Sequence, residues 1–408
     1  MRFGNGVKNL KGSEGCPAQA IDTTHTKRKR TEFSAKFHHL DTKWVSGFTK
    51  AVNIILFGYP RTGKTTLFNL LTGAGIKVRA YEDGKKEPNV RTCALPDPRL
   101  DGLSALHPDK KKIAAPVDVT DLAGISYGDV KDNAYFDHLH KADGLVHVVR
   151  GFRDERVPHP KGKISPADDI RVMEEELVLS DLVMVNARIE KLEKDLKKMK
   201  DPDGEKEKGV LERLRLFLEE GKGVRDFPLS PAEEKSLRSF AFLSQKPLLN
   251  MINLDEADAA RLGAPGEIFG LGPKAAPTLA FCGRIESEIL ELGDEEKELF
   301  MSGYGIKEPS NARFFRQAPR FLDVLTFFTI GKEEVRAWTV RRGSTAVKAA
   351  GAIHSDIEKG FIRAEVVPCE EVLRLGSLQR ARDAGAIRLE GKNYVVRDGD
   401  VIYFRFTQ

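Results

Sequence analysis

The stretch Gly58-Tyr59-Pro60-Arg61-Thr62-Gly63-Lys64-Thr65 decides the fold, because it has the residues and the spacing of a phosphate-binding loop. The apolar run Val52–Phe57 precedes it and the apolar segment Thr66–Leu71 follows it, so the predicted order is strand, loop, helix. The glycines let backbone N–H groups point inward, and the helix presents its positive end to the same phosphates. The sequence therefore predicts binding of a nucleoside triphosphate. The alternative, an ordinary glycine turn, does not explain the strand and helix around it.

The loop residues have separate expected tasks. Lys64 would neutralise the β and γ phosphates and act in catalysis, while the Thr65 hydroxyl would bind Mg²⁺. Contacts to the cofactor are expected from Tyr59, Pro60, Arg61, Thr62, Gly63, Lys64, Thr65 and Thr66.

A second magnesium contact is expected at Asp121. The alternating segment Ala115–Thr120 reads as a strand and leads into Asp121-Leu122-Ala123-Gly124. A carboxylate at a strand end can hold a metal-bound water, and the Gly124 N–H can meet the γ-phosphate. Further buried strands are predicted at Gly144–Val149 and Pro247–Ile252. Strands that alternate with helices predict a doubly wound α/β sheet.

Composition sets the limits on domains and compartment. At 408 residues the chain should form two or three domains. No apolar run is long enough to span a bilayer, and no secretory signal follows Met1, so we expect a soluble protein with no membrane partner. The four cysteines have no CxxC spacing, which argues against zinc and disulfides and favours the cytoplasm. They are Cys16, Cys93, Cys282 and Cys369.

The first fifty residues carry ten Lys/Arg against four Asp/Glu, and the net charge of the whole chain is +5. The basic excess therefore belongs to this segment, which we expect to be disordered. A mitochondrial targeting segment, a nuclear signal, an RNA-contacting arm and a solvated extension are the alternatives. Its acidic residues weaken the mitochondrial interpretation.

A helical hairpin is predicted between the strands at Gly144–Val149 and Pro247–Ile252. One apolar stripe has alternating spacings of three and four, and a second follows the breaker Asp201–Gly204. The first stripe contains Leu182, Val185, Ile189, Leu192, Leu196 and Met199, and the second contains Val210, Leu214 and Phe217. Dense Glu and Lys favour a projecting hairpin over one that packs on the sheet.

From about Phe321 the pattern changes to a small α+β module. Strands are predicted at Val335–Val340, Phe361–Val366 and Val401–Phe406, and a short helix begins at Ala346.

Together these segments resemble the Obg-like ATPases, the YchF type within the P-loop GTPase class, over roughly residues 50–408. The resemblance rests on the loop and on five further motifs. These are Leu95–Asp101, Asp121–Gly124, Pro166–Ile170, Glu334–Thr339 and Ile353–Ile362. It implies an ATPase with a G domain, an inserted coiled coil and a ubiquitin-like TGS domain, associated with ribosomes and with stress or translation control.

The expected domains follow from these patterns and the resemblance. They are a basic extension at 1–50, a P-loop NTPase domain at 51–165 and 241–320, an inserted hairpin at 166–240 and a TGS-like domain at 321–408. The resemblance implies a ribosome or another RNA–protein particle as partner and no DNA partner.

Base selection is expected at Asn253-Leu254-Asp255-Glu256. Most GTPases read guanine with NKxD, whose Asp accepts from two guanine donors. The stretch here is similar to the family's NxxE pattern, which implies ATP; two neighbouring carboxylates leave GTP as an alternative. The expected base contacts are Asn253, Leu254, Glu256, Cys282 and Gly283, unless Asn253 only caps the following turn.

Catalysis departs from the usual GTPase pattern. Ile125 stands where many GTPases carry a water-orienting Gln, and a hydrocarbon cannot do that. The resemblance implies a catalytic histidine from a mobile loop, and His159 matches that position. A surface-loop histidine is the alternative.

Three departures bear on turnover. Asp83–Lys86 lacks the Thr expected in switch I, and Ser126–Asn133 lacks most glycines of switch II. Arg61 replaces an Asn that holds K⁺ in potassium-stimulated relatives, and we hypothesise that its guanidinium supplies that charge in catalysis. The sequence favours a slow ATP-dependent switch protein. A nucleotide-binding scaffold without hydrolysis and a GTP-using translation factor are the alternatives.

Overall fold

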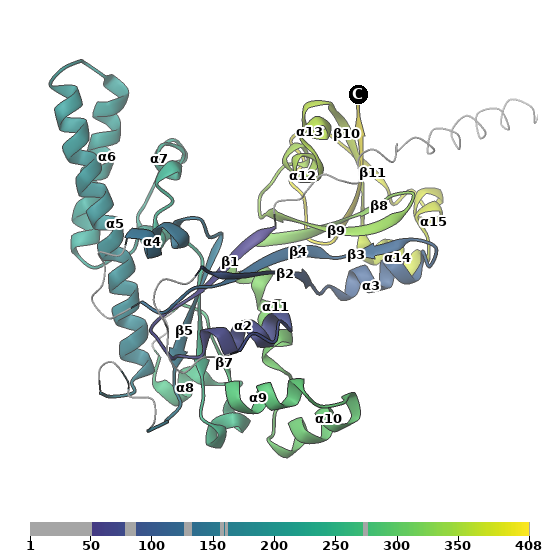
Figure 1. Ribbon diagram of the computed structural model, residues 1–408. Coiled ribbons are helices and arrows are strands. Elements are labelled where there is room, and N and C mark those ends of the chain that lie inside the picture. Colours follow the sequence, from purple (N-terminus) through teal and green to yellow (C-terminus); the bar gives the residue numbers. More distant parts are fainter. Residues whose placement is uncertain are drawn as a thin grey trace, which may run out of the picture. The chain divides into compact units, whose positions relative to one another are not determined.

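The computed structural model describes residues 51–77, 87–125, 133–155, 159, 162–271 and 276–407 (Figure 1). Residues 1–50, the switch I positions 83–86 and switch II positions 126–132 lie outside these ranges, so the predictions made for them stay predictions. Among the helices of the described ranges, none is both long and apolar enough to cross a membrane.

The first sheet has six strands in the order β2-β4-β1-β5-β6-β7. All neighbours pair in parallel except β2, which runs antiparallel to β4. The strands are β1 (Val52–Phe57), β2 (Asn89–Leu95), β4 (Ala115–Asp121), β5 (Gly144–Arg150), β6 (Leu248–Asn253) and β7 (Thr278–Phe281). The four strands of this sheet that were predicted from the sequence, β1, β4, β5 and β6, are all present.

Helices cover both faces of this sheet, which confirms the doubly wound class. On one face α2 (Lys64–Thr72) and α11 (Ser310–Phe321) bury Leu67, Phe68 and Phe314 against β1 and β5. On the other face α4 (Asn133–His140) and the first turns of the next long helix bury Leu139 and Met173. Further short helices, α8 (Pro265–Phe269), α9 (Gly283–Leu290) and α10 (Asp294–Gly303), surround β6 and β7.

The predicted helical hairpin consists of α5 (Pro166–Leu196) and α6 (Pro202–Glu219), and it extends away from the sheet in Figure 1. The stripe predicted from the sequence lies in the second half of α5 and packs on α6 rather than on the sheet, as the projecting interpretation expects. Met173 and Leu177 in the first half pack on the sheet, whereas the second half packs on α6. The buried seam between the helices contains Val185, Ile189, Leu192, Leu211, Leu214 and Leu218.

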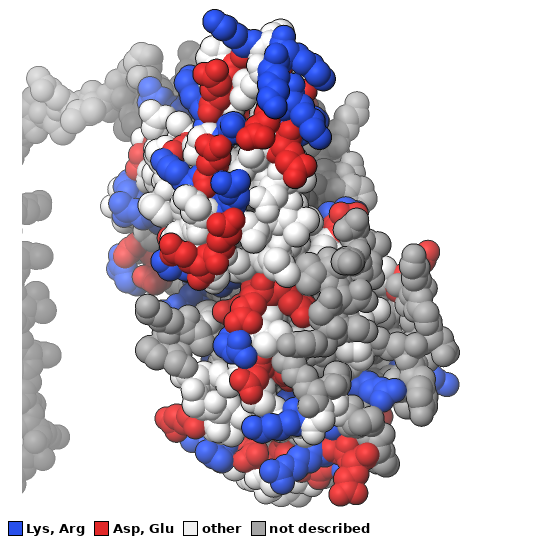
Figure 2. All heavy atoms as spheres, turned by 90° about the vertical axis from the view of Figure 1, so that its left-hand side faces the viewer, with Lys and Arg blue, Asp and Glu red and all other residues white. Residues whose placement is uncertain are grey.

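Two details of the predicted seam are wrong. Met199 is 71% exposed, because α5 ends at Leu196 and the chain turns before α6. The second stripe follows Leu211, Leu214 and Leu218, while Phe217 lies at its edge against Phe227. Figure 2 shows acidic and basic side chains interleaved over the hairpin, as its composition predicted.

The base of the hairpin is fixed by a buried carboxylate. Asp181 on α5 is fully buried and accepts hydrogen bonds from the backbone N–H groups of Leu243 and Ser244, each at 2.8 Å. The Ser244 hydroxyl donates to it at 2.6 Å. These donors lie in the short helix η5 (Leu243–Gln245), which follows the return of the chain through α7 (Pro231–Leu237) and η4 (Arg238–Phe240). Asp181 therefore ties the start of the insertion to its end.

The second sheet has the order β11-β10-β12-β8-β9-β3. Its strands are β3 (Lys111–Ile113), β8 (Val324–Ile330), β9 (Glu334–Arg341), β10 (Phe361–Pro368), β11 (Arg388–Glu390) and β12 (Asp400–Phe406). One face packs on α12 (Ala346–Ile353) and α13 (Ser355–Lys359), which bury Trp338 and Phe404. The other packs on α3 (Pro98–Ala105), α14 (Cys369–Leu375) and α15 (Leu378–Asp383). The C-terminal strands predicted from sequence are all present.

Strand β3 is unexpected, because it lies between β2 and β4 in the chain but belongs to the second sheet. It pairs in parallel with β9, placing Lys112 opposite Val335. One residue, Ala114, separates β3 from β4 of the first sheet. A single run of chain therefore passes from one sheet to the other.

Arg99 strengthens the same junction. Its guanidinium contacts Asp97 at 2.8 Å and Asp398, in the turn before β12, at 2.7 Å. The guanidinium also lies over the Phe328 ring, 5.4 Å from its centroid. Asp398 in turn accepts from the Thr326 N–H at 2.9 Å. The motif Leu95–Asp101 thus attaches the first part of the chain to the second sheet.

Replacing Arg99 should weaken this junction. We expect Arg99→Ala to lower the free energy of unfolding by about 2 kcal/mol, because two partly buried carboxylates lose a charged donor. Arg374→Ala, which removes an exposed i,i+3 pair with Glu371, should cost less than about 0.5 kcal/mol. Urea unfolding measures both. Equal stability of the two variants would contradict the assignment of Arg99 to the junction.

Candidate nucleotide-binding site

The loop after β1 has the backbone geometry that a phosphate cradle requires. Gly58 and Gly63 have φ angles of 137° and 99°, which side chains other than glycine rarely adopt. A Cβ at Gly58 would lie 2.7 Å from the Val148 carbonyl oxygen. One at Gly63 would lie 2.4 Å from the Asn253 Nδ2 atom. Gly63 is also the N-cap of α2, so the helix begins directly at the loop.

Lys64 is held within the loop. Its side chain is buried, and Nζ donates to the carbonyl oxygens of Tyr59 at 2.7 Å and Gly58 at 3.3 Å. The Thr62 hydroxyl donates to the same Tyr59 oxygen at 3.2 Å. The ammonium group is therefore positioned by the loop itself. That arrangement lowers the cost of ordering the lysine when it meets an anion.

The two expected magnesium ligands lie together. The Thr65 hydroxyl donates to Asp121 Oδ2 at 2.8 Å, and the Asn89 amide donates to the same oxygen at 3.2 Å. Asn89, the first residue of β2, was not predicted to belong to the site. The strand register that pairs it with Asp121 is the feature that identifies it. A hydroxyl and one carboxylate fit Mg²⁺, which usually takes one or two protein oxygens together with phosphates and waters. The described ranges contain no cluster of three His, Cys, Asp or Glu side chains suited to another metal.

The segment after Asp121 packs tightly on the loop. A Cβ at Gly124 would lie 2.5 Å from Pro60 Cα, so only glycine fits there. The Ile125 N–H donates to the Gly58 carbonyl at 3.2 Å, and the Ile125 side chain is buried beside Tyr135. Ile125 therefore belongs to the core in this structure.

Asn253 connects the loop to the segment expected behind the base. Its amide donates to the Thr62 carbonyl at 3.2 Å, and its Oδ1 accepts from the Gly283 N–H at 2.9 Å. The interpretation of Asn253 as a simple turn cap is wrong, because the following helix η6 (Glu256–Arg261) has Asp255 at its N-cap. Thr66 lies against Gly283, because a Cβ added to Gly283 would lie 3.0 Å from Thr66 Cγ2.

The other expected base contacts differ in exposure. Leu254 is 2% exposed and packs in the core beside Ile285, so its side chain does not face an open site. Cys282 is also buried, and this burial raises the pKa of its thiol to about 11. Both residues retain backbone groups that can contact a ligand.

The two carboxylates of the base motif each have a partner. Glu256 forms an ion pair with Arg284 at 2.6 Å, and Asp255 accepts from the Arg153 N–H at 3.1 Å. The ion pair between Glu256 and Arg284 was not predicted from the sequence. Each carboxylate of the motif therefore already has a partner within the protein.

His159 is not a surface histidine. Its side chain is 3% exposed, and Nε2 lies 3.0 Å from Oδ2 of Asp169, which is 1% exposed in the first turn of α5. The surface-loop interpretation is therefore wrong. Asp169 belongs to the motif Pro166–Ile170, whose role the sequence did not indicate.

The polar residues His147 and Tyr135 contact the phosphate loop at Gly58, and neither was predicted from the sequence. His147 on β5 is 1% exposed and contacts Gly58, because a Cβ at Gly58 would lie 3.1 Å from its Cδ2. Burial is the main cause that lowers the pKa of His147 to about 3; the neighbouring Asn250 side chain raises the pKa and the Lys64 charge lowers it. The Tyr135 hydroxyl accepts from the Gly58 N–H at 3.3 Å. The phosphate loop therefore packs against neutral side chains.

The buried imidazole predicts a pH dependence of stability. Its folded pKa of about 3 lies below the ordinary value of 6.5, so the unfolded state binds the proton first as the pH falls. From pH 6.5 downward this residue should lower the free energy of unfolding by about 1.4 kcal/mol per pH unit. His147→Gln should remove that part of the slope in urea unfolding between pH 7.5 and 4.5. His138→Gln on α4 leaves the buried imidazole in place and should keep it. Identical slopes in all three proteins would contradict the prediction.

Comparison with known proteins gives matches over both sheets. Residues 53–206 match the family described as 50S ribosome-binding GTPase. Residues 324–407 match the YchF-GTPase C-terminal family, which is described as a protein of unknown function. The chain is similar to a solved structure, the YchF GTPase of Schizosaccharomyces pombe, with a TM-score of 0.73 and 25% identity. The match covers 89% of this chain and 99% of that one.

Curated relatives match over nearly their full length. The ribosome-binding ATPase YchF of Bacillus subtilis is 39% identical over 86% of this chain and 98% of its own. The Obg-like ATPase 1 of Pongo abelii is 33% identical over 89% of this chain and 94% of its own.

Proposed function

This chain belongs to the YchF type of the Obg-like ATPases, and from that membership we propose that it is a slow ATP-dependent switch protein. Its triphosphate state would change how the hairpin and the second sheet meet a ribosome or another RNA–protein particle. The ribosome enters this proposal through the names of the relatives, which is weaker support than a site. The proposal places the protein in the cytoplasm, and a mitochondrial location through residues 1–50 is the alternative.

The observation that carries the proposal is the cluster at the carboxyl ends of β1 and β4. Lys64 is held by the loop carbonyls, and Thr65 and Asp121 lie 2.8 Å apart. When bound there, Mg²⁺ would neutralise charge on the β and γ phosphates. The protein's own part is to orient the triphosphate with loop N–H groups and Lys64, and to fix Asp121 through Asn89.

The first test is nucleotide binding and hydrolysis in Lys64→Ala. Losing charged hydrogen bonds worth about 1.5–3 kcal/mol should weaken binding of a non-hydrolysable ATP analogue roughly 10- to 100-fold. Lys77→Ala, at an exposed position after α2, should bind as the wild type does. Isothermal titration measures the affinities, and steady-state phosphate release with Mg²⁺ measures the activity.

The outcomes separate the candidate functions. If the wild type and Lys64→Ala release phosphate at the same background rate while the wild type still binds the analogue, the chain is a scaffold. If a GTP analogue binds more tightly than the ATP analogue, the GTP-using alternative replaces the proposal. If neither nucleotide binds at millimolar concentration, all three fail.

Adenine is the proposed base. Guanine recognition needs a carboxylate that accepts from N1–H and the 2-amino group. Here Arg284 engages Glu256, and the Arg153 backbone engages Asp255. The proposed contacts to the base and sugar come from this motif and from the Cys282–Gly283 backbone, with Asn253 positioning both segments.

His159 remains our candidate for the catalytic histidine, and its pair with Asp169 bears on the mechanism. An acidic partner fixes the orientation of an imidazole. To reach a water at the γ-phosphate, the side chain would first have to leave this buried contact. Slow turnover follows from that requirement, because Ile125 cannot orient the water in its place.

Arg61 is proposed to replace a monovalent cation. It has φ of 60° within the loop, and its positive charge lies near enough to Arg150 to lower that residue's pKa, although burial of Arg150 is the larger cause. The ATPase rate of the wild type should therefore be the same in K⁺ and in Na⁺ at matched ionic strength. Arg61→Asn should create a K⁺ response, and Arg61→Lys, which keeps the charge, should not. A wild type stimulated by K⁺ would refute this role.

A further inference from the structure

A pocket of about 540 Å³ lies at the opposite edge of the first sheet from the nucleotide site. It is lined by Val52 at the start of β1, Asp143 just before β5 and Pro247 just before β6. The phosphate loop follows the other end of β1, and six residues of extended strand span roughly 20 Å. The pocket is therefore separate from the candidate nucleotide site. Its volume is typical of sites for small molecules.

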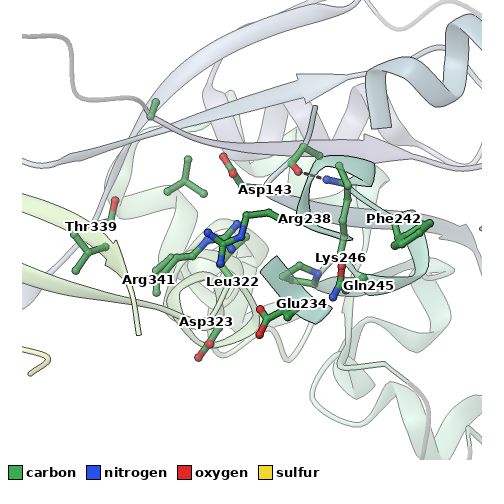
Figure 3. A pocket seen from close by; sticks show the side chains of 17 residues that line it. Asp143, Glu234, Arg238, Phe242, Gln245, Lys246, Leu322, Asp323, Thr339 and Arg341 are labelled. Carbon is green, nitrogen blue, oxygen red and sulfur yellow. Dashed lines mark hydrogen bonds between the residues drawn. The ribbon is translucent and has the colours of Figure 1, made fainter. Parts of the chain in front are cut away.

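Three parts of the structure meet at this pocket. The first sheet supplies the strand ends, and the return of the helical insertion supplies Arg238 and Phe242. The second sheet supplies Thr339 and Arg341 at the end of β9. Figure 3 shows Arg238 and Arg341 extending into the pocket from these two different elements. Val52, Leu322 and Val324 give the pocket an apolar floor.

Three of the six charged side chains that line the pocket are already engaged in hydrogen bonds or ion pairs. Lys246 donates to the carbonyls of His140 at 3.0 Å and Ala142 at 2.7 Å. Asp143 accepts from the Asn53 N–H at 3.0 Å. Asp323 accepts from Arg342, the neighbour of Arg341, at 3.2 Å.

The two arginines differ from these groups. Within the described part of the chain, neither the Arg238 nor the Arg341 side chain has a hydrogen bond or an ion pair, and Glu234 is the remaining unpaired acid on the lining. Two guanidinium groups directed into one pocket attract an anion that lies between them. Arginine is also the side chain best suited to bind a phosphate group through two parallel N–H donors.

We propose that this pocket binds a small phosphorylated ligand, with Arg238 and Arg341 on its phosphate and the apolar floor against its body. The ligand would contact the first sheet, the insertion and the second sheet together. The site is independent of the proposed nucleotide function, because none of its lining residues belongs to the phosphate loop.

The test uses pyrophosphate as the probe in the full chain carrying Lys64→Ala, which weakens competing binding at the loop. Isothermal titration should show binding that falls at least tenfold when Arg238→Ala and Arg341→Ala are combined. Each single substitution should have a smaller effect. Lys235→Ala removes a neighbouring charge that does not line the pocket, and it should leave the affinity within twofold.

A second readout needs no variant in the pocket. Pyrophosphate should protect Arg238 and Arg341 from phenylglyoxal, with peptide mass spectrometry as the measurement and Arg342 as the unprotected reference. Equal affinity in all variants, or modification unaffected by pyrophosphate, would overturn the proposal. Binding of a short RNA without any binding of pyrophosphate would also overturn it, because the ligand class would then be a macromolecule.

Discussion

Parallel pairing of the central strands is the constraint on which the site depends. Because β1, β4, β5 and β6 run in the same direction, their carboxyl ends meet at one edge. That edge receives the phosphate loop, Asp121 and Asn253 from segments far apart in the chain. Asn253 then bonds to both the loop and Gly283, so the base segment and the phosphate segment keep a fixed relation. The common direction of these strands therefore determines which residues meet at the site.

Much of this arrangement could be predicted from sequence, since the loop motif, the strand ends and the C-terminal strands have strong local signals. The rest depends on contacts between distant segments. Strand β3 has two exposed lysines among its three residues and no alternation, so only its partner β9 identifies it. Arg99 reads as an ordinary surface cation until Asp398 lies beside it. His159 reads as a loop residue because Asp169 lies in a motif whose purpose the sequence does not state.

The site combines ordinary binding groups with unusual surroundings for hydrolysis. Lys64, Thr65 and Asp121 are arranged as in a nucleotide switch. The position after the DxxG motif, by contrast, carries a core isoleucine, and the imidazole of His159 is buried with a carboxylate. Binding and turnover therefore place separate demands on this structure. In the proposed mechanism, affinity for the triphosphate depends on the first group of residues, and the rate of hydrolysis depends on how readily the His159–Asp169 pair opens.

The passage from β3 through Ala114 into β4 gives the two sheets a common backbone, with Asp121 at its far end. If nucleotide binding at Asp121 shifts β4, the continuous backbone would carry that shift into the C-terminal sheet. Thermodynamic linkage makes that influence mutual. If the cofactor changes the dissociation constant of a macromolecule bound to the C-terminal sheet, that macromolecule must change the dissociation constant of the cofactor by the same factor.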